Sequence, residues 1–490
     1  MKLTPLLAAL VLPVSAATNV VFIMADDLGY MDVGFNNPET FYDTPRLNAL
    51  ARQSMRFTAG YAACPVCSPT RSSILTGQYP ARTRNSDYFG APNEFQELPE
   101  SYDAGKDGRF GKHAKRPLLP APYLGRLADS HLTLAEAFKR RGYATMHAGK
   151  WHLGPAGSFP EDHGFDVNVG GLERGGPYGG DKYFSPYGNP KLPDGPKGEH
   201  LPDRLAREVA RFIAGHKDQP FFVYLPFYSV HTPLMGRPDL VEKYRAKRSE
   251  LGLQPGFEPE SPRRNRSVQE HAVYAAMVEA MDQAVGTVLD ALDEHGVADN
   301  TLVVFFSDNG GLSTSEGSPT SNLPYRAGKG WMYEGGIREP LLVRWPGVAG
   351  PGTCDVPVIS TDFYPTLLEA SGGELDPGQH RDGVSLVPLL KGDAGFERGP
   401  IFWHYPHWGN QGGIPAAAVR DGDWKLIEFY WGKGMELYNL AADPGERTNL
   451  AAKHPEKVAE LKARLDAFRR DTDALMPTPN PAAAEDFDKW

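Results

Sequence analysis

Two cysteines and an arginine lie close together in the segment Cys64-Pro-Val-Cys67-Ser-Pro-Thr-Arg71. Proline suits the first helical position, because its missing N–H would have no partner there. Pro69 therefore predicts the start of a helix, with Ser68 or Cys67 as the N-cap. The free N–H groups and the positive end of the helix dipole would face Cys67, and Arg71 adds a fixed charge with several donors. The segment predicts a thiol beside a site for an anion.

The same cysteines allow other interpretations. Cys64-x-x-Cys67 could be half of a zinc site or a redox pair, although zinc usually takes four ligands and no second C-x-x-C occurs. Cys67 could also be an ordinary thiol. The third cysteine, Cys354, could form a disulfide with Cys64. The residues alone leave these alternatives open.

Polar side chains follow several short apolar runs that predict buried parallel strands. Asp26 and Asp27 follow the run 19–25, and Asp308 and Asn309 follow the run 301–306. Ligands of α/β sheets gather at the carboxyl ends of the strands. Oxygen ligands without a set of thiolates or imidazoles favour Ca²⁺ or Mg²⁺, although such pairs also occur as solvated turns or helix caps.

Further apolar runs at 143–148 and 220–225 are followed by Lys150, His152 and His231. Helical and strand patterns alternate along most of the chain, which predicts an α/β fold with helices on both faces of a sheet. The pattern changes from about residue 396. There the segments 417–430 and 435–438 predict strands joined by tight turns, with a helix over 455–470.

Two signatures carry a resemblance to a known family. The stretch Cys67 to Arg71, followed by Ile74-Leu-Thr-Gly77, resembles the first signature of the type I sulfatases, in which the cysteine is oxidised to formylglycine. The stretch Gly142 to His152 is similar to the second signature, and Asp443 to Leu450 resembles a motif of the sulfatase C-terminal domain. The resemblance implies an alkaline phosphatase-like fold, in which helices sandwich a large mixed sheet. A smaller C-terminal α+β subdomain would carry an antiparallel sheet and a helix.

The resemblance also implies a role for each polar residue of the site. Ca²⁺, rather than Mg²⁺, would be bound by Asp26, Asp27, Asp308, Asn309 and the modified Cys67. Arg71 and Lys150 would orient the hydrated aldehyde, and His152 would be the base that releases sulfate. His231 and Lys329 would hold sulfate oxygens, with His231 as the proton donor to the leaving oxygen. A maturation enzyme would be required to generate the formylglycine.

The expected activity is hydrolysis of a sulfuric ester, and two stretches favour a sulfated carbohydrate as substrate. The stretch 402–413 combines aromatic, imidazole and amide side chains, from which we take His404, His407 and Trp408 as candidate sugar contacts. The basic run 109–116 could steer a polyanion. The first stretch could equally pack the domains together, and the second could be a solvated loop. A phosphomonoester or phosphonate hydrolase of the same superfamily and a catalytically silent glycan-binding protein are the alternative functions.

Bulk properties limit the location and partners. The 490 residues are sufficient for a catalytic domain over 18–395 and a subdomain over 396–490, after a signal peptide over 1–17 that predicts export to the periplasm or medium. The formal charge of −10 argues against nucleic acid as a partner. No later run of ~20 apolar residues occurs, so we expect no membrane span.

Overall fold

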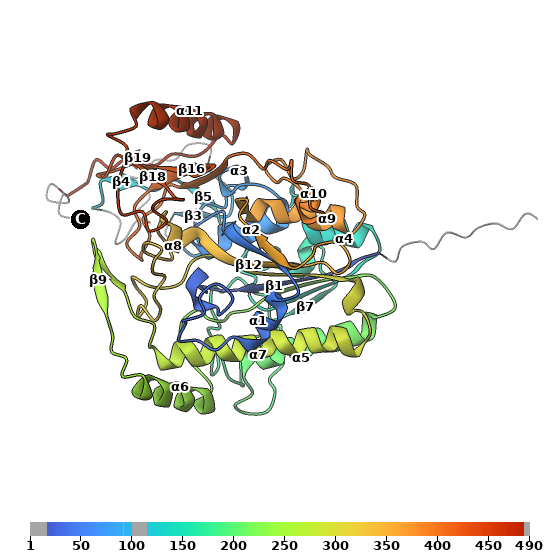
Figure 1. Ribbon diagram of the computed structural model, residues 1–490. Helices are drawn as coiled ribbons and strands as arrows, with labels where there is room; N and C mark the ends of the chain where they lie inside the picture. The colour runs from blue at the N-terminus through green and yellow to red at the C-terminus, as the bar shows by residue number, and fades with distance from the viewer. Residues whose placement is uncertain (1–16, 92, 100–114, 485–490) are drawn as a thin grey trace, which may run out of the picture.

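The computed structural model describes residues 17–91, 93–99 and 115–484, and its centre is a 9-stranded mixed sheet (Figure 1). In spatial order the strands are β13 (Gly352–Cys354), β2 (Met55–Tyr61), β12 (Arg338–Arg344), β11 (Thr301–Ser307), β1 (Asn19–Ala25), β8 (Phe221–Pro226), β6 (Ala144–Ala148) and β7 (Val167–Val169), with β14 (Val358–Ile359) also paired to β2. Only β12 runs against the others, because it pairs antiparallel with both β11 and β2. The carboxyl ends of the remaining strands therefore lie at one edge.

Helices cover both faces of the sheet (Figure 1). On one face are α1 (Pro45–Ala51), α5 (Leu201–His216), α6 (Pro238–Glu250) and α7 (Ala272–Glu294), and on the other are α2 (Cys67–Thr76), α4 (Leu134–Arg140), α9 (Phe363–Ala370) and α10 (Val387–Leu390). The sequence of β1 explains this arrangement, because its side chains alternate between two apolar cores. Val21 and Ile23 belong to one core, and Val20, Phe22 and Met24 to the other.

A second, antiparallel sheet forms the C-terminal part of the chain. Its order is β15 (Ile401–Tyr405), β16 (Ala416–Asp421), β17 (Trp424–Phe429) and β18 (Met435–Asn439). The helix α11 (Pro455–Asp471) packs on this sheet through its buried Leu461, Leu465 and Phe468. The fold class expected from the sequence, a large mixed sheet between helices with a smaller antiparallel subdomain, is confirmed.

Short elements complete the described part. They are β3 (Glu94–Phe95), β4 (Leu118–Leu119), β5 (Tyr123–Leu124), β9 (Phe257–Glu260), β10 (Arg263–Arg266), β19 (Thr478–Pro479), α3 (Pro80–Thr83) and α8 (Glu334–Ile337), together with short 3₁₀ turns. Within the residues that the structure describes, no helix is both long enough and apolar enough to cross a membrane. The predicted signal peptide, apart from its last residue, and most of the basic run 109–116 lie outside the described residues.

The structure corrects one local expectation and decides one alternative that the sequence left open. The helix α2 begins at Cys67 itself, with Val66 as N-cap, so Pro69 is its third residue. The position still suits proline, because the first four N–H groups of a helix have no partner within it. The disulfide considered between Cys64 and Cys354 is not formed, and both are free, buried thiols. Cys354 pairs with Phe57 in β2 whereas Cys64 follows the far end of that strand, beyond the ~4–7 Å between Cα atoms that a disulfide spans.

Candidate active site

The thiol of Cys67 lies at the start of a helix that is buried along its whole length. Val66 before it is extended, with φ −137° and ψ 160°, and Gly77 ends the helix in the left-handed conformation, with φ 67°. Glycine is favoured there because the conformation is strained for other residues. The side chain of Cys67 is 3% exposed, so the helix places it at the bottom of a cavity and not on the surface.

Four oxygen-bearing side chains surround this helix start, at the ends of β1 and β11. Asp26, Asp27, Asp308 and Asn309 are all fully buried. The amide of Asn309 donates to Asp27 Oδ1 over 2.8 Å, and the backbone N–H of Asp27 donates to Asp308 Oδ1 over 3.3 Å. Because β1 and β11 are adjacent parallel strands, residues 281 positions apart meet at one edge of the sheet.

Three cations balance the buried carboxylates. Lys150 Nζ lies 2.6 Å from Asp26 Oδ2, Arg71 Nη2 lies 2.7 Å from Asp308 Oδ2, and Lys329 Nζ lies 2.8 Å from Asp27 Oδ1. Arg71 also donates to the carbonyl oxygen of Lys150 over 2.7 Å. Buried charges are costly unless they are paired, so these pairs fix the carboxylates and the cations together.

The two neighbouring aspartates have opposite pKa shifts. Burial and the nearby Asp308 charge raise the pKa of Asp26 to about 8, although Lys150 partly offsets them. Burial alone would raise the pKa of Asp27 too, but the charges of Lys329 and His231 hold it below its usual range. Asp27 is therefore ionised at neutral pH, whereas Asp26 needs a further positive charge nearby to be fully ionised.

The donor set fits a divalent cation. Asp26 Oδ1 and Asn309 Oδ1 are buried and accept no hydrogen bond from the residues that the structure describes. One ligand atom from each of Asp26, Cys67 and Asp308 can be chosen so that all lie within 4.8 Å of one another. Carboxylate and amide oxygens without further partners are what Ca²⁺ or Mg²⁺ requires, and such a charge would also lower the pKa of Asp26.

His152 is held in one tautomer by its neighbours. Its Nε2 lies 3.0 Å from the carbonyl oxygen of Phe89, which can only accept, so Nε2 carries the hydrogen. Nδ1 is then the lone-pair nitrogen, and it faces Ser68 Oγ at 3.1 Å and Cys67 Sγ at 3.6 Å. Burial and the charge of Lys150 keep the pKa of His152 well below 6.5. The geometry makes His152 a neutral base directed at residue 67.

His231 and Lys329 both lie beside Asp27. His231 Nδ1 donates to the carbonyl oxygen of Thr232 over 2.7 Å, and its Nε2 lies 3.8 Å from Asp27 Oδ2. Burial and the charge of Lys329 lower the pKa of His231 to about 4. Burial would lower the pKa of Lys329 as well, but the charge of Asp27 raises it well above its ordinary value. Lys329 is thus a permanent cation at the cavity.

A cavity of about 240 Å³ opens above these groups. It is lined by Val66, Cys67, Tyr88, Phe89, His152, Gly175, Tyr178, His231, Glu316, Lys329, Asn410 and Gln411. The structure thus brings Cys67, His152, His231 and Lys329 to one cavity, above the paired Arg71, Lys150 and oxygen ligands. Sequence reasoning did not single out Ser68 as a partner of His152, nor Tyr178 or Glu316. They lie in no strand-end pattern, and Tyr178 and Glu316 come from irregular loops.

The three candidate sugar contacts lie elsewhere. His404, His407 and Trp408 are buried, and none of them is among the residues that line this cavity. His404 contacts Tyr430 and Leu475, His407 contacts Ser86 and Asn93, and the indole of Trp408 donates to Leu118. His407 and Trp408 pack the C-terminal part against the rest of the chain, which is the alternative that the sequence left open, whereas His404 packs within the C-terminal part. From the same stretch, Asn410 and Gln411 reach the cavity instead.

Together, the fold and the site define an α/β protein with a buried cysteine at a helix start, beside oxygen ligands that could hold a cation. A family model described as "Sulfatase" matches residues 18–373, and one described as "N-sulphoglucosamine sulphohydrolase, C-terminal" matches residues 327–471. The chain therefore belongs to the sulfatase family of the alkaline phosphatase superfamily, and it is a sulfatase, a hydrolase of sulfuric esters.

Individual relatives agree with this assignment over nearly the whole chain. A sulfatase of Formosa agariphila is 33% identical, with 90% of this chain and 85% of the relative covered. Human arylsulfatase A is 32% identical, with 95% and 90% covered. Among solved structures, Ps i-CgsB superposes with a TM-score of 0.73 at 26% identity, covering 96% of this chain and 95% of that one.

Proposed function

We propose that the protein removes sulfate from a sulfated carbohydrate, with a formylglycine made from Cys67 as nucleophile and a bound Ca²⁺. The observation that carries the proposal is the position of residue 67. Its side chain lies 3.6 Å from the lone-pair nitrogen of a neutral histidine, next to buried oxygens that accept no hydrogen bond from the described residues. A plain thiol with a pKa raised by burial, as Cys67 has, would be a poor nucleophile. Oxidation to an aldehyde by a maturation enzyme removes that difficulty.

The hydrated aldehyde would supply two hydroxyls on one carbon, one to attack sulfur and one to expel sulfate. A bound Ca²⁺ would supply positive charge for the sulfate and for the attacking oxygen. Asp26, Asp27, Asp308 and Asn309 are the residues that would hold it, with an oxygen of the modified residue 67. Their arrangement around unpartnered oxygens supports this assignment.

The surrounding side chains would divide the proton transfers between them. His152 Nδ1 would take the proton of the second hydroxyl, so that the C–O bond to sulfate breaks and the aldehyde returns. His231 would protonate the oxygen of the leaving alcohol, and for this the negative charge of the bound ester must raise its pKa from about 4. Arg71 and Lys150 would orient the nucleophile, and Lys329 would hold a sulfate oxygen. Water then rehydrates the aldehyde.

A carbohydrate substrate is supported by a similar protein. The structure of Ps i-CgsB has also been determined in complex with k-i-k-neocarrahexaose, and that protein is 26% identical to this one. The cavity itself offers amide, hydroxyl and carboxylate groups from Asn410, Gln411, Tyr178 and Glu316. Such groups suit the hydroxyls of a sugar ring. Export through an N-terminal signal peptide is part of the same proposal, since polymeric substrates lie outside the cell.

The test combines a mass measurement with an assay. Protein coexpressed with a maturation enzyme should show conversion of Cys67 to formylglycine in the peptide that contains it. It should release sulfate, and not phosphate, from 4-methylumbelliferyl esters and from sulfated oligosaccharides. Cys67→Ala should abolish release while the melting temperature stays near that of the wild type. Full activity with an unmodified thiol would refute the nucleophile, and release of phosphate alone would favour the phosphatase alternative.

Metal binding has a readout of its own. Added Ca²⁺ should raise the melting temperature of the chelator-treated protein, because a ligand that binds only the folded state stabilises it. Asp308→Asn should abolish that shift. An equal shift in the variant would contradict the assignment of these oxygens. A matured protein that binds sulfated glycans but releases no sulfate would instead indicate the silent binding protein.

A further inference from the structure

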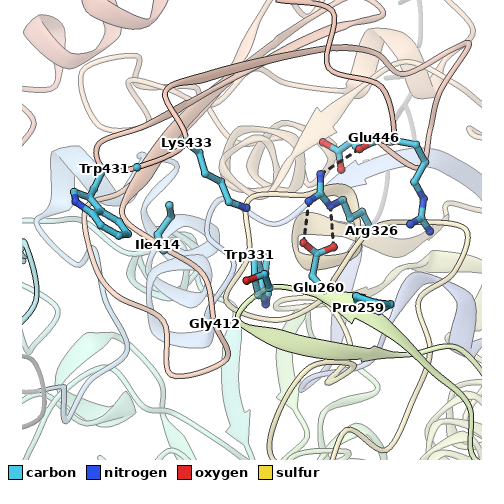
Figure 2. A pocket seen from close by; sticks show the side chains of 12 residues that line it. Pro259, Glu260, Arg326, Trp331, Gly412, Ile414, Trp431, Lys433 and Glu446 are labelled. Atoms are coloured by element: carbon cyan, nitrogen blue, oxygen red, sulfur yellow. Dashed lines mark hydrogen bonds and ion pairs between the residues drawn. The ribbon is translucent and has the colours of Figure 1, made fainter. Parts of the chain in front are cut away.

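A second cavity, of about 560 Å³, has lining residues that neighbour those of the active-site cavity in the chain, and Figure 2 shows its lining. It lies where three parts of the chain meet: the hairpin of β9 and β10, the segment that follows Lys329, and the C-terminal subdomain. Its lining residues include Glu260, Arg326, Trp331, Gly412, Trp431 and Lys433.

Two segments of the chain contribute lining residues to both cavities. Lys329 lines the active-site cavity, and Trp331, two residues later, lines the second cavity. Likewise, Gln411 lines the active-site cavity and the next residue, Gly412, lines the second. The indole N–H of Trp331 lies 3.2 Å from the carbonyl oxygen of Gln411, which joins the two segments. A Cβ added to Gly413 would lie 1.7 Å from the carbonyl oxygen of Gly330, so the segments pack backbone against backbone. The two cavities are therefore neighbours, separated by these two segments.

Most charges in the second cavity are already balanced. Arg326 makes two contacts of 2.8 Å with the carboxylate of Glu260, and Glu446 lies 2.9 Å from the buried Lys425. Lys433 is different, because among the described residues no carboxylate lies within ion-pair distance of it. Its ammonium lies 3.2 Å from the hydroxyl of Tyr333.

Aromatic rings support the ammonium of Lys433. It lies 5.6 Å from the ring centre of Trp331, 5.4 Å from that of Tyr333 and 5.1 Å from that of Phe429. Figure 2 shows it above Trp331, between Trp431 and Arg326. Rings on one side hold the cation in place without neutralising it, so its remaining donors can meet an anion in the cavity.

We propose that this cavity is a subsite for a second anionic sugar unit of the substrate, with its sulfate or carboxylate group on Lys433 and its ring against Trp431. Indole faces and a cation in one cavity suit a charged sugar, whose ring carbons are apolar on one side. The inference rests on the proposed function, since it assumes that the active-site cavity receives a sulfated sugar of the same oligosaccharide.

The test measures binding without turnover, in the Cys67→Ala background. Calorimetry would use hexasaccharides and disaccharides prepared from ι-carrageenan, heparin and chondroitin sulfate, with neutral neoagarohexaose as comparison. Lys433→Gln should weaken binding of at least one charged hexasaccharide by about tenfold, the effect of one charge-assisted hydrogen bond, and should weaken the matching disaccharide far less. The sulfated and carboxylated probes show which anion the subsite prefers.

Matched variants separate the local effect from bulk charge. Lys433→Arg keeps the cation and should retain most of the affinity, and Lys217→Gln removes an equal charge from an exposed position after α5. Equal weakening of hexasaccharide and disaccharide, no effect of Lys433→Gln, or no binding of any charged hexasaccharide would each overturn the subsite. Sulfate release by the matured wild type without a Lys433 effect would leave the proposed function intact. Lys433-dependent binding without any sulfate release would support the subsite but contradict the proposed function.

Discussion

At the scale of single residues, backbone groups decide which nitrogen of His152 is the base. The carbonyl of Phe89 fixes the hydrogen on Nε2, and burial keeps the ring neutral. We expect His152→Ala to lower kcat by ~10²–10⁴, the usual contribution of a positioned base, and added imidazole to restore part of the loss.

Because the pKa of His152 is well below 6.5, this group should cause no fall in wild-type kcat between pH 8 and pH 6.5. The measurement is kcat for 4-methylumbelliferyl sulfate against pH, with conversion of residue 67 checked by mass. A wild-type kcat in the variant would contradict the role.

Glu316 is a carboxylate in a cavity proposed to receive an anion. Gln411 donates to its Oε1 over 2.8 Å, and the hydroxyl of Thr232, next to His231, lies 3.4 Å from its Oε2. We expect Glu316→Gln to strengthen inhibition by inorganic sulfate about fivefold, since a nearby unit charge in partly solvated surroundings is worth ~1 kcal/mol. The inhibition constant measures this, and Glu374→Gln, at an exposed position, is the matched control. Unchanged inhibition would show that Glu316 does not act on the sulfate position.

Much of the candidate active site could be predicted from the sequence, because its polar residues occur in short motifs at the ends of strands. Asp26, Asp308 and Lys150 each follow an apolar run, and the α/β pattern brings such ends to one edge. Glu316 could not be found in this way, because its position depends on an irregular loop and a backbone φ of 54°. His404 and Trp408 show the complementary limit: an aromatic-rich stretch suits a sugar site and a domain contact equally well, and the sequence does not say which way its side chains point.

At the scale of elements, the start of α1 is capped from another helix. Thr44 is its N-cap but makes no side-chain cap hydrogen bond. Instead, Asp282 in α7 accepts from the backbone N–H of Arg46 over 3.0 Å and of Leu47 over 2.7 Å. We expect Asp282→Ala to lower the free energy of unfolding by ~1–3 kcal/mol, because one buried and one partly buried donor lose their acceptor. Urea denaturation measures the loss.

The same helix provides a control for this prediction. Among the described residues, Asp290 forms an ion pair with Arg46 alone, and its side chain is 65% exposed. Asp290→Ala should change the free energy of unfolding by less than ~0.5 kcal/mol, as exposed pairs contribute little. Hydrogen exchange in α1 should speed up in Asp282→Ala alone. Equal effects of the two variants would show that the cap is not what holds α1 on α7.

Strand prediction succeeded or failed for identifiable reasons. The strands β1, β8 and β11 are continuous apolar runs buried on both faces, and the sequence pattern indicated each of them. The strand β2 was not predicted. It contains Arg56, Thr58 and Gly60, and glycine weakens a strand pattern. The strand β12 begins with Arg338 and Glu339, contains Pro340 and shifts register against β2. Its pairing partners, and not its own pattern, make it a strand.

At the scale of the whole molecule, a buried charge cluster joins the C-terminal sheet to the large domain. Lys425 in β17 is fully buried and lies 2.9 Å from both Glu334 in α8 and Glu446 in the loop after β18. Tyr61 in β2 also donates to Glu334 over 2.7 Å. One lysine thus pairs with two carboxylates between the two parts. The motif Asp443 to Leu450, noted in the sequence for its resemblance, supplies one of them.

Removing Lys425 should weaken the contact between the C-terminal sheet and the large domain and so lower the free energy of unfolding. Lys425→Met keeps the length of the side chain but leaves two buried carboxylates without their cation, which should cost about 3–5 kcal/mol of unfolding free energy. Lys462→Met is the control, because Lys462 is 25% exposed and pairs with Asp466 over 2.6 Å on α11. Its loss should cost no more than ~1 kcal/mol. Urea denaturation followed by tryptophan fluorescence would compare the two variants with the wild type.

The pH dependence of this loss identifies its cause. Burial and the charge of Glu334 raise the pKa of Glu446 from 4.5 to about 7 in the folded protein, despite Lys425. The pKa of Glu334 is lowered to about 2, because the charges of Lys425, Arg338 and Arg420 together outweigh its burial. A carboxyl whose pKa is raised on folding contributes stability below its unfolded pKa, and this contribution is lost as the pH rises through the folded value. Without Lys425 both pKa values rise, so more stability is lost on going from pH 5 to pH 8.

The deficit of Lys425→Met in unfolding free energy should therefore be larger at pH 8 than at pH 5, where a proton replaces the missing cation. A deficit that is equal at the two pH values would mean that lost packing, and not unpaired charge, destabilises the variant.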